Sequence, residues 1–123
     1  MSRPPIHGLQ VHRAQRFIER LCGLLARPRL QLHQALLLSP CASVHTCFMR
    51  YPIDVVFLDA QAQVLQITPA LKPWRMALCL RAHSTLELCA GAAQHFGLRV
   101  GCVIPAATLR GPSQDSLNPR ISP

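Results

Sequence analysis

The chain has 123 residues, of which 50% are apolar and 15% are charged, so it has the size and composition of one globular domain rather than of a disordered chain. Its 13 lysine and arginine residues against five acids give a formal charge of +8, which attracts anions without specificity. No apolar run approaches the roughly 20 residues needed to span a bilayer. The first residues lack the apolar core of a signal peptide, which predicts a cytoplasmic protein.

The N-terminal part is expected to hold a helix. Residues 1–10 have the composition of a flexible arm, broken by two prolines and a glycine. Between Val11 and Leu25, apolar side chains recur at spacings of three and four, which predicts one buried helical stripe. Arg13, Arg16 and Arg20 line another face, which is either solvated or a docking surface for an acidic partner or nucleic acid. Few aromatic residues accompany the arginines, so nucleic-acid binding (with Arg29 added) is the less favoured alternative.

The rest of the chain is dominated by short β-prone runs joined by turns. Strands are expected at residues 35–38, 44–51, 53–58, 63–68, 76–80, 84–89 and 98–104, and a short helix at 91–96. Asp59 is expected to open the turn of a hairpin, accepting backbone N–H groups. The pattern predicts an α+β, mostly β fold: a small curved antiparallel sheet or partly closed barrel, with an N-terminal helix and one short C-terminal helix. Residues 11–104 form the single domain, and 105–123 a disordered tail.

Residues 44–59 combine the densest β-prone run with a polar set. Pro52 cannot donate to a central ladder, so it predicts a bend between two strands. Arg50 and Asp54 lie on either side of this bend, where they form either a structural ion pair or an anion site in which Asp54 orients the Arg50 guanidinium. His45 and Cys47 share one face of the first strand, and this spacing would also suit a nucleophile and its base.

Six cysteines are present, and none forms a C-x-x-C pair, so zinc-ribbon and thioredoxin-type motifs are absent. Most have apolar neighbours, which predicts buried and unreactive thiols. We predict no cofactor and no metal site. Glu87 lies between two leucines, and alternation favours an exposed position for it. Trp74 is expected to pack at an edge of the core, whereas the neighbouring Arg75 is a possible partner for an anion.

The order of these segments resembles the bacterial and archaeal family called domain of unknown function 192. The resemblance is carried by Gly23 to Arg27 with Leu30, by Ala35 to Leu38, by Phe48 to Asp59, by Leu86 to Gly91 and by Gly97 to Gly101. It covers about residues 15 to 104. Ala35, Phe48 and Cys102 stand where the family usually has glycine, tryptophan and aspartate. The resemblance implies a small, mostly β domain and implies no activity.

These observations favour a non-enzymatic binding or accessory module for an anionic small molecule or an acidic protein partner. The expected site is the rim around Arg50 and Asp54, and its possible further members are Thr46, His45, Arg27 and Glu87. The first alternative is a hydrolase or transferase that uses Cys47 and His45. The second is nucleic-acid binding through the arginines of the N-terminal helix. The sequence leaves the oligomeric state open.

Overall fold

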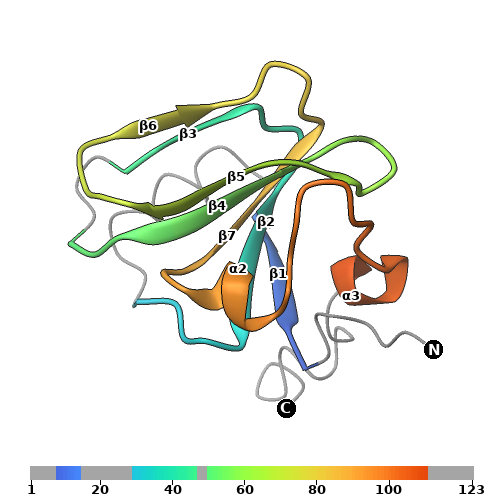
Figure 1. The fold of residues 1–123 in the computed structure, drawn as a ribbon, viewed down its shortest axis with the longest axis horizontal. Coiled ribbons are helices and arrows are strands. Elements are labelled where there is room, and N and C mark those ends of the chain that lie inside the picture. Colours follow the sequence, from blue (N-terminus) through green and yellow to red (C-terminus); the bar gives the residue numbers. More distant parts are fainter. Residues whose placement is uncertain (1–7, 15–28, 47–49, 111–123) are drawn as a thin grey trace, which may run out of the picture.

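The computed structural model describes residues 8–14, 29–46 and 50–110, and Figure 1 shows their arrangement. Seven strands and two short helices lie in these ranges. The strands are β1 (Gln10–Ala14), β2 (Gln34–Leu38), β3 (Ser43–His45), β4 (Ile53–Leu58), β5 (Val64–Leu71), β6 (Met76–Leu78) and β7 (Ser84–Cys89), and the helices are α2 (Ala92–His95) and α3 (Ala106–Arg110).

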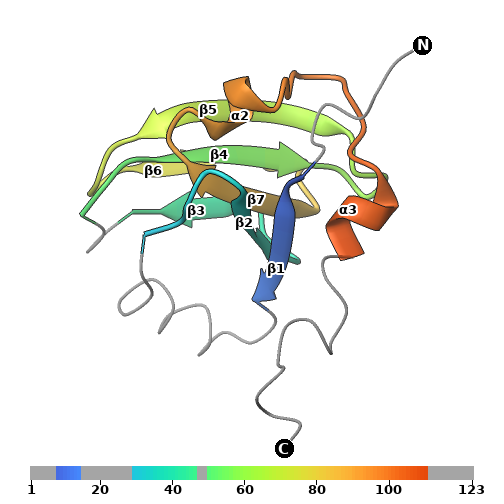
Figure 2. The ribbon, with the colours of Figure 1, turned by 90° about the horizontal axis from the view of Figure 1, so that it is seen from below.

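The main sheet has the strand order β1-β2-β7-β4-β5, and a small second sheet pairs β3 with β6. The edge strand β1 is parallel to β2, whereas the other pairs are antiparallel. The described strands therefore form a mixed sheet with a small companion sheet, rather than the partly closed barrel that the sequence left open. Figures 1 and 2 show β3 and β6 lying together along one side of the main sheet.

Strand β4 lies at the centre of the fold because both of its faces are buried. Val56 and Leu58 point to a core that contains α2, together with Leu86 and Leu88 of β7. The alternate residues Ile53, Val55 and Phe57 belong to a second core, which they share with residues of β3 and β6. A strand buried on both faces is almost wholly apolar, and this explains the unbroken run V-V-F-L in the sequence.

Several predicted elements are confirmed. β2, β4 and β7 lie where the sequence placed strands, and β4 and β5 form the predicted hairpin. Asp59 opens its turn as expected, because its Oδ1 accepts the N–H groups of Gln61 at 2.8 Å and Gln63 at 2.9 Å. No disulfide joins the described cysteines, and the predicted burial holds for two of them, Cys41 and Cys79, whereas Cys89 and Cys102 are half-buried.

Other expectations were wrong. Residues 10–14 are a strand rather than the start of a helix, because they pair with β2 and bury Val11 in the core; residues 15–25 of the expected helix lie outside the described ranges. The strand expected at 98–104 is reduced to one bridge between Gln63 and Val103. Helix α3 occupies a stretch that was assigned to the tail, and it packs against β1.

Candidate functional site

Asp54 is the centre of the predicted site, and the structure buries it. Only 1% of its surface is exposed, on the face of β4 that meets α2. Its Oδ1 accepts the N–H of Ala70 at 2.8 Å, and its Oδ2 accepts those of Gly91 at 3.1 Å and Ala93 at 2.9 Å. A carboxylate can satisfy several backbone donors at once because both oxygens only accept. Asp54 therefore ties the irregular end of β5 and the start of α2 to the central strand.

One interpretation of the proline bend was a structural ion pair between Arg50 and Asp54. Within the described residues, no salt bridge joins these two side chains. Arg50 is exposed in the turn before β4, whereas Asp54 faces the interior. The alternative in which Asp54 directly orients the guanidinium is likewise not seen, because both carboxylate oxygens accept hydrogen bonds from backbone amides.

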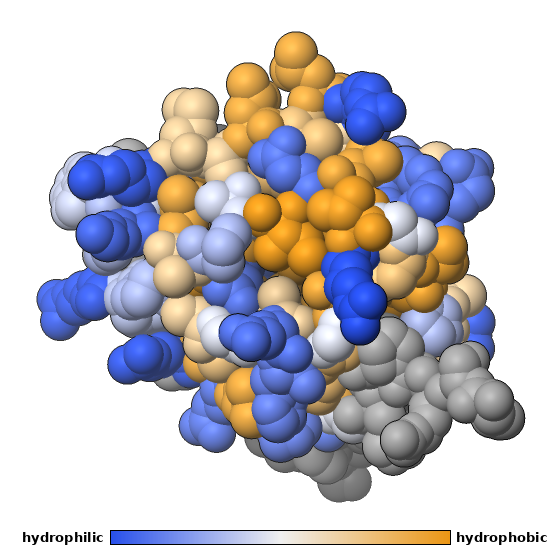
Figure 3. Space-filling model, viewed as in Figure 1, coloured by the Kyte–Doolittle hydropathy of each residue, from blue (hydrophilic) through white to orange (hydrophobic). Residues whose placement is uncertain are grey.

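Arg50 belongs instead to a group of exposed cations at one end of the molecule. We call Arg29, Arg50, Lys72 and Arg75 the basic rim; all four are exposed, and they come from the segments before β2, before β4 and between β5 and β6. Two contacts place these segments together: Ile53 pairs with Leu71, and the Arg29 guanidinium carbon lies 5.3 Å from the centre of the Tyr51 ring. Figure 3 shows hydrophilic side chains gathered along the left edge, where Figure 1 places the start of β4 and the β5–β6 turn.

Thr46 is fully buried and holds the turn that carries two of these cations. Its Oγ1 accepts the N–H of Arg75 at 2.9 Å and lies 2.6 Å from the carbonyl oxygen of Lys72, to which it donates. Its backbone N–H donates to the Arg75 carbonyl at 2.8 Å, and its own carbonyl accepts the N–H of Trp74 at 3.1 Å. Thr46 thus fixes the backbone of residues 72–75 rather than presenting its hydroxyl to a ligand.

His45 and Glu87 were the other predicted neighbours, and they lie in different environments. His45 is exposed at the end of β3, opposite Met76 and next to the turn held by Thr46. Glu87 is 1% exposed, between Leu36 and Val55 in the sheet, so the expectation of outward exposure was wrong. It does point away from Leu86 and Leu88, as alternation requires, but both faces of the sheet are covered at this position.

Some predicted residues lie outside the described ranges: Arg27, Cys47, Arg16 and Arg20. Of the arginines assigned to a helical docking face, Arg13 is on strand β1, and its Nη2 donates to the carbonyl of Leu109 at 3.2 Å. Arg29 lies against Tyr51. The helical spacing that suggested one arginine face therefore does not apply at Arg13.

Cys89 is a described thiol whose pKa is shifted by its burial and by two residues of this region, Asp54 and Arg29. It lies opposite Ile53 in the ladder and is half-buried. Burial raises the pKa of the Cys89 thiol, the negative charge of Asp54 raises it further, and the positive charge of Arg29 opposes both. The thiol is therefore less ionised than an ordinary cysteine, which disfavours a nucleophilic role.

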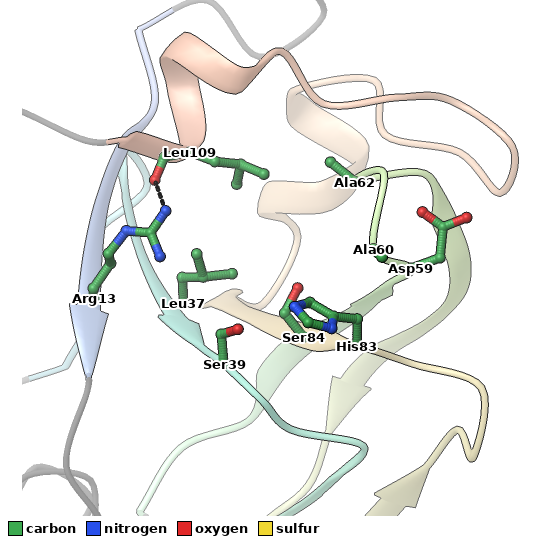
Figure 4. A pocket seen from close by; sticks show the side chains of 9 residues that line it. All are labelled: Arg13, Leu37, Ser39, Asp59, Ala60, Ala62, His83, Ser84 and Leu109. Carbon is green, nitrogen blue, oxygen red and sulfur yellow. Dashed lines mark hydrogen bonds between the residues drawn. The ribbon is translucent and has the colours of Figure 1, made fainter.

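A separate cavity of about 140 Å³ lies near the other end of β4 (Figure 4). Arg13 borders it on one side, and Asp59 and His83 border it on the opposite side, while Leu37 and Leu109 supply apolar walls. This cavity was not predicted, because its lining comes from five separate segments of the chain. Asp59 lies after the last residue of β4, whereas the basic rim lies near its first residue, Ile53, so the cavity is not part of the rim.

No cluster of three or more histidine, cysteine or acidic side chains suited to a metal ion occurs within the described ranges. Among the same residues, no helix is both long and apolar enough to cross a membrane.

Comparisons with known proteins identify relatives. The model of the family domain of unknown function 192, described as Uncharacterized ACR, matches residues 2–106. A UPF0127 protein of Pyrococcus furiosus is 46% identical over 70 residues, and one of Pyrococcus horikoshii is 43% identical over the same length. Each match covers 54% of this chain and 60% of the relative, so the chain spans less than two thirds of these curated proteins.

Two solved structures share the fold. A protein of unknown function from Novosphingobium aromaticivorans has a TM-score of 0.66 at 20% identity, covering 76% of this chain and 71% of that one. A protein from Sinorhizobium meliloti, named as a candidate transcription regulator, has a TM-score of 0.67 at 20% identity, covering 76% of this chain and 78% of that one. At this level of identity, the likeness extends to the fold alone.

Proposed function

The chain belongs to the family of domain of unknown function 192, and we propose that it is a non-enzymatic binding module whose ligand is anionic. The ligand is an anionic small molecule or the acidic tail of a partner protein, bound by the basic rim. Arg50 and Arg75 contact the ligand, His45 lies beside them, and Thr46 and Asp54 act by holding the two loops in place. Arg27 remains a predicted member of the same site.

The basic rim is the observation that carries this proposal. Four exposed cations come from three separate loops, and Asp54, the described acid four residues after Arg50 in the chain, is buried against three backbone amides. A carboxylate whose lone pairs are directed to those amides is sealed from the rim cations, so their field is available to an incoming anion. Guanidinium groups bind carboxylates and phosphates well because their planar N–H pattern matches two oxygens.

The hydrogen bonds that hold the backbone around these cations also support a binding role. Five hydrogen bonds of 2.6 to 3.2 Å join the 72–75 turn to one buried threonine, Thr46. Cations that project from a fixed turn lose less conformational freedom on binding than cations on a loose loop. The rim is therefore suited to reversible binding, in which electrostatic attraction supplies most of the affinity.

The test is titration with two anions, a decaglutamate peptide and citrate, followed by calorimetry at low and at moderate salt. The double variant Arg50→Gln/Arg75→Gln is compared with Arg99→Gln/Arg110→Gln, which removes the same charge from exposed positions outside the rim. Each exposed pair contributes about 0.5 to 1 kcal/mol, so the rim variant should bind roughly five to thirty times more weakly. Equal weakening in both variants would show that only net charge matters and would overturn the rim as a site.

A further inference from the structure

A row of exposed apolar side chains runs along β6. Met76 and Leu78 point outward from the small sheet, while Ala77 between them is buried in the second core. Trp74 before the strand and Leu80 after it continue the alternation, and the four side chains are 51 to 82% exposed. We call these four residues the apolar row. A solvent-exposed apolar row of this length often marks an interaction surface.

The backbone is strained where the row begins. Trp74 has a φ of 63°, in the left-handed region that a bulky aromatic residue rarely adopts. It follows Pro73 in a turn whose geometry favours glycine at that position. Three hydrogen bonds hold this conformation: the Thr46 hydroxyl donates to the Lys72 carbonyl, the Arg75 N–H donates to that hydroxyl, and the Trp74 N–H donates to the Thr46 carbonyl. The fold therefore maintains a strained turn, and the result is that Trp74 is 59% exposed.

The charges around the row have one sign. Lys72 and Arg75 flank its start and Arg81 follows its end, and all three are exposed. Of the three acids in the described ranges, Asp54 and Glu87 are buried, and Asp59 is only partly exposed, in the β4–β5 turn. In Figure 3, hydrophobic side chains protrude at the top, over the end of β6, with hydrophilic ones beside them. The partner of this face is therefore apolar and negatively charged at once.

We propose that the apolar row and the basic rim dock together on an anionic lipid bilayer. Trp74, Met76, Leu78 and Leu80 enter the headgroup region, and Lys72, Arg75 and Arg81 lie against lipid phosphates. Tryptophan favours this depth because its ring is apolar and its N–H is polar. The electrostatic half of this inference rests on the proposed anion-binding function; the apolar half is independent of it.

Two properties of the row favour a bilayer over other occupants. A second copy of the chain would bring Lys72, Arg75 and Arg81 against the same residues across a symmetric interface, and such like charges repel. The side chains of the row protrude instead of lining a groove, so a folded partner would need matching hollows. A fluid bilayer adapts to protruding side chains without them, and anionic lipid adds about 1 kcal/mol of attraction for each nearby cation.

Trp74 reports on the docking because it is the single tryptophan of the chain. The full chain is mixed with phosphatidylcholine vesicles, with and without about 30% phosphatidylglycerol, to vary the surface charge. We expect the Trp74 emission to shift to shorter wavelength only with the anionic vesicles, and to be quenched by a lipid that carries a nitroxide at a shallow position. Sedimentation with the vesicles measures the affinity.

The variant Met76→Ser/Leu80→Ser removes two exposed side chains of the row and leaves Trp74 as reporter. Its matched control, Val100→Ser/Val103→Ser, changes two exposed apolar residues outside the row. Each lost side chain should weaken vesicle binding on the order of tenfold, whereas the control should bind like the original chain. Circular dichroism confirms that both variants are folded.

The outcomes separate this inference from the proposed function. Binding of decaglutamate or citrate without vesicle binding would overturn the bilayer and leave the basic rim standing. Failure to bind any of the three probes would overturn both. Equal binding to neutral vesicles, or unchanged binding of the row variant, would refute the joint role of charge and apolar contact. A concentration-dependent emission shift without lipid would identify a second copy as the occupant.

Discussion

Replacing Asp54 with asparagine is expected to destabilise the protein strongly, although the two side chains have nearly the same shape. The carboxylate uses both oxygens, one for Ala70 and the other for Gly91 and Ala93. Asparagine offers one oxygen and one NH₂ group. Whichever way it is oriented, the NH₂ group faces a backbone N–H donor, and at least one backbone donor loses its acceptor.

The size of the loss follows from these contacts. One unsatisfied buried donor costs about 1 to 3 kcal/mol, and hydrogen bonds to a charged acceptor are worth about 1.5 to 3 kcal/mol each, against less for a neutral one. Losing one such bond and weakening the remaining ones gives about 3 kcal/mol in the free energy of unfolding. Small domains have only about 5 to 15 kcal/mol in total, so the variant should be folded but markedly less stable.

Urea unfolding followed by far-ultraviolet circular dichroism measures this loss. With a slope of about 2 kcal/mol per molar urea, the midpoint should fall by roughly 1.5 M. Asp59→Asn is the matched control, because a single oxygen of Asp59 accepts both N–H groups at 2.8 and 2.9 Å, and asparagine keeps that oxygen. It should lose less than about 1 kcal/mol. A similarly small loss for Asp54→Asn would refute the argument that both oxygens of Asp54 are needed.

Three further predictions concern single side chains. Burial and then the charge of Asp54 raise the pKa of the Cys89 thiol, so iodoacetamide should alkylate this thiol more slowly in the folded chain than in urea. The contribution of the protonated Cys89 thiol to the free energy of unfolding is full below pH 9.0, its ordinary pKa, and is lost as the pH rises through the folded pKa. Unfolding at several alkaline pH values would detect this loss. Trp74→Gly should keep the free energy of unfolding within about 1 kcal/mol or increase it, because glycine accepts the positive φ. In the sedimentation assay it should weaken vesicle binding on the order of tenfold, and a large loss of stability would contradict a strained turn. Phe57→Ala should lower the free energy of unfolding by about 3 to 5 kcal/mol in the same urea assay, because the ring is fully buried. A loss below about 1 kcal/mol would mean that the second core is not packed as described.

The strands of the sheet could be predicted because their sequence patterns are local. The run from Ile53 to Leu58 is β-prone and apolar on both faces, and an aspartate that opens a turn after it marks a hairpin. The first strand could not be predicted in this way. Val11 and Ala14 also fit a helical spacing, and what decides between helix and strand is the pairing of β1 with β2, a contact with residues more than 20 positions later.

The candidate site shows the same division. The sequence identified Arg50 and Asp54 correctly as neighbours of a bend, but not the direction of their side chains. The donors that hold Asp54 come from Ala70, Gly91 and Ala93, which are backbone groups and leave no mark in side-chain patterns. Trp74 was expected in the core, since most tryptophans are largely buried. The buried threonine that turns it outward lies 28 residues earlier in the chain, so its effect on Trp74 was not visible from the sequence.

The order of strands in the sheet also sets an order in which the protein can assemble during synthesis. β4 and β5 are adjacent in the chain, so their hairpin can form as soon as both have been made. β2 pairs with β1 on one side and with β7 on the other, and β7 also pairs with β4. Until β7 leaves the ribosome, the early strands and the hairpin are two separate pieces with open edges. β7 joins them in a single step, and we expect this late insertion of a central strand to limit the rate of folding.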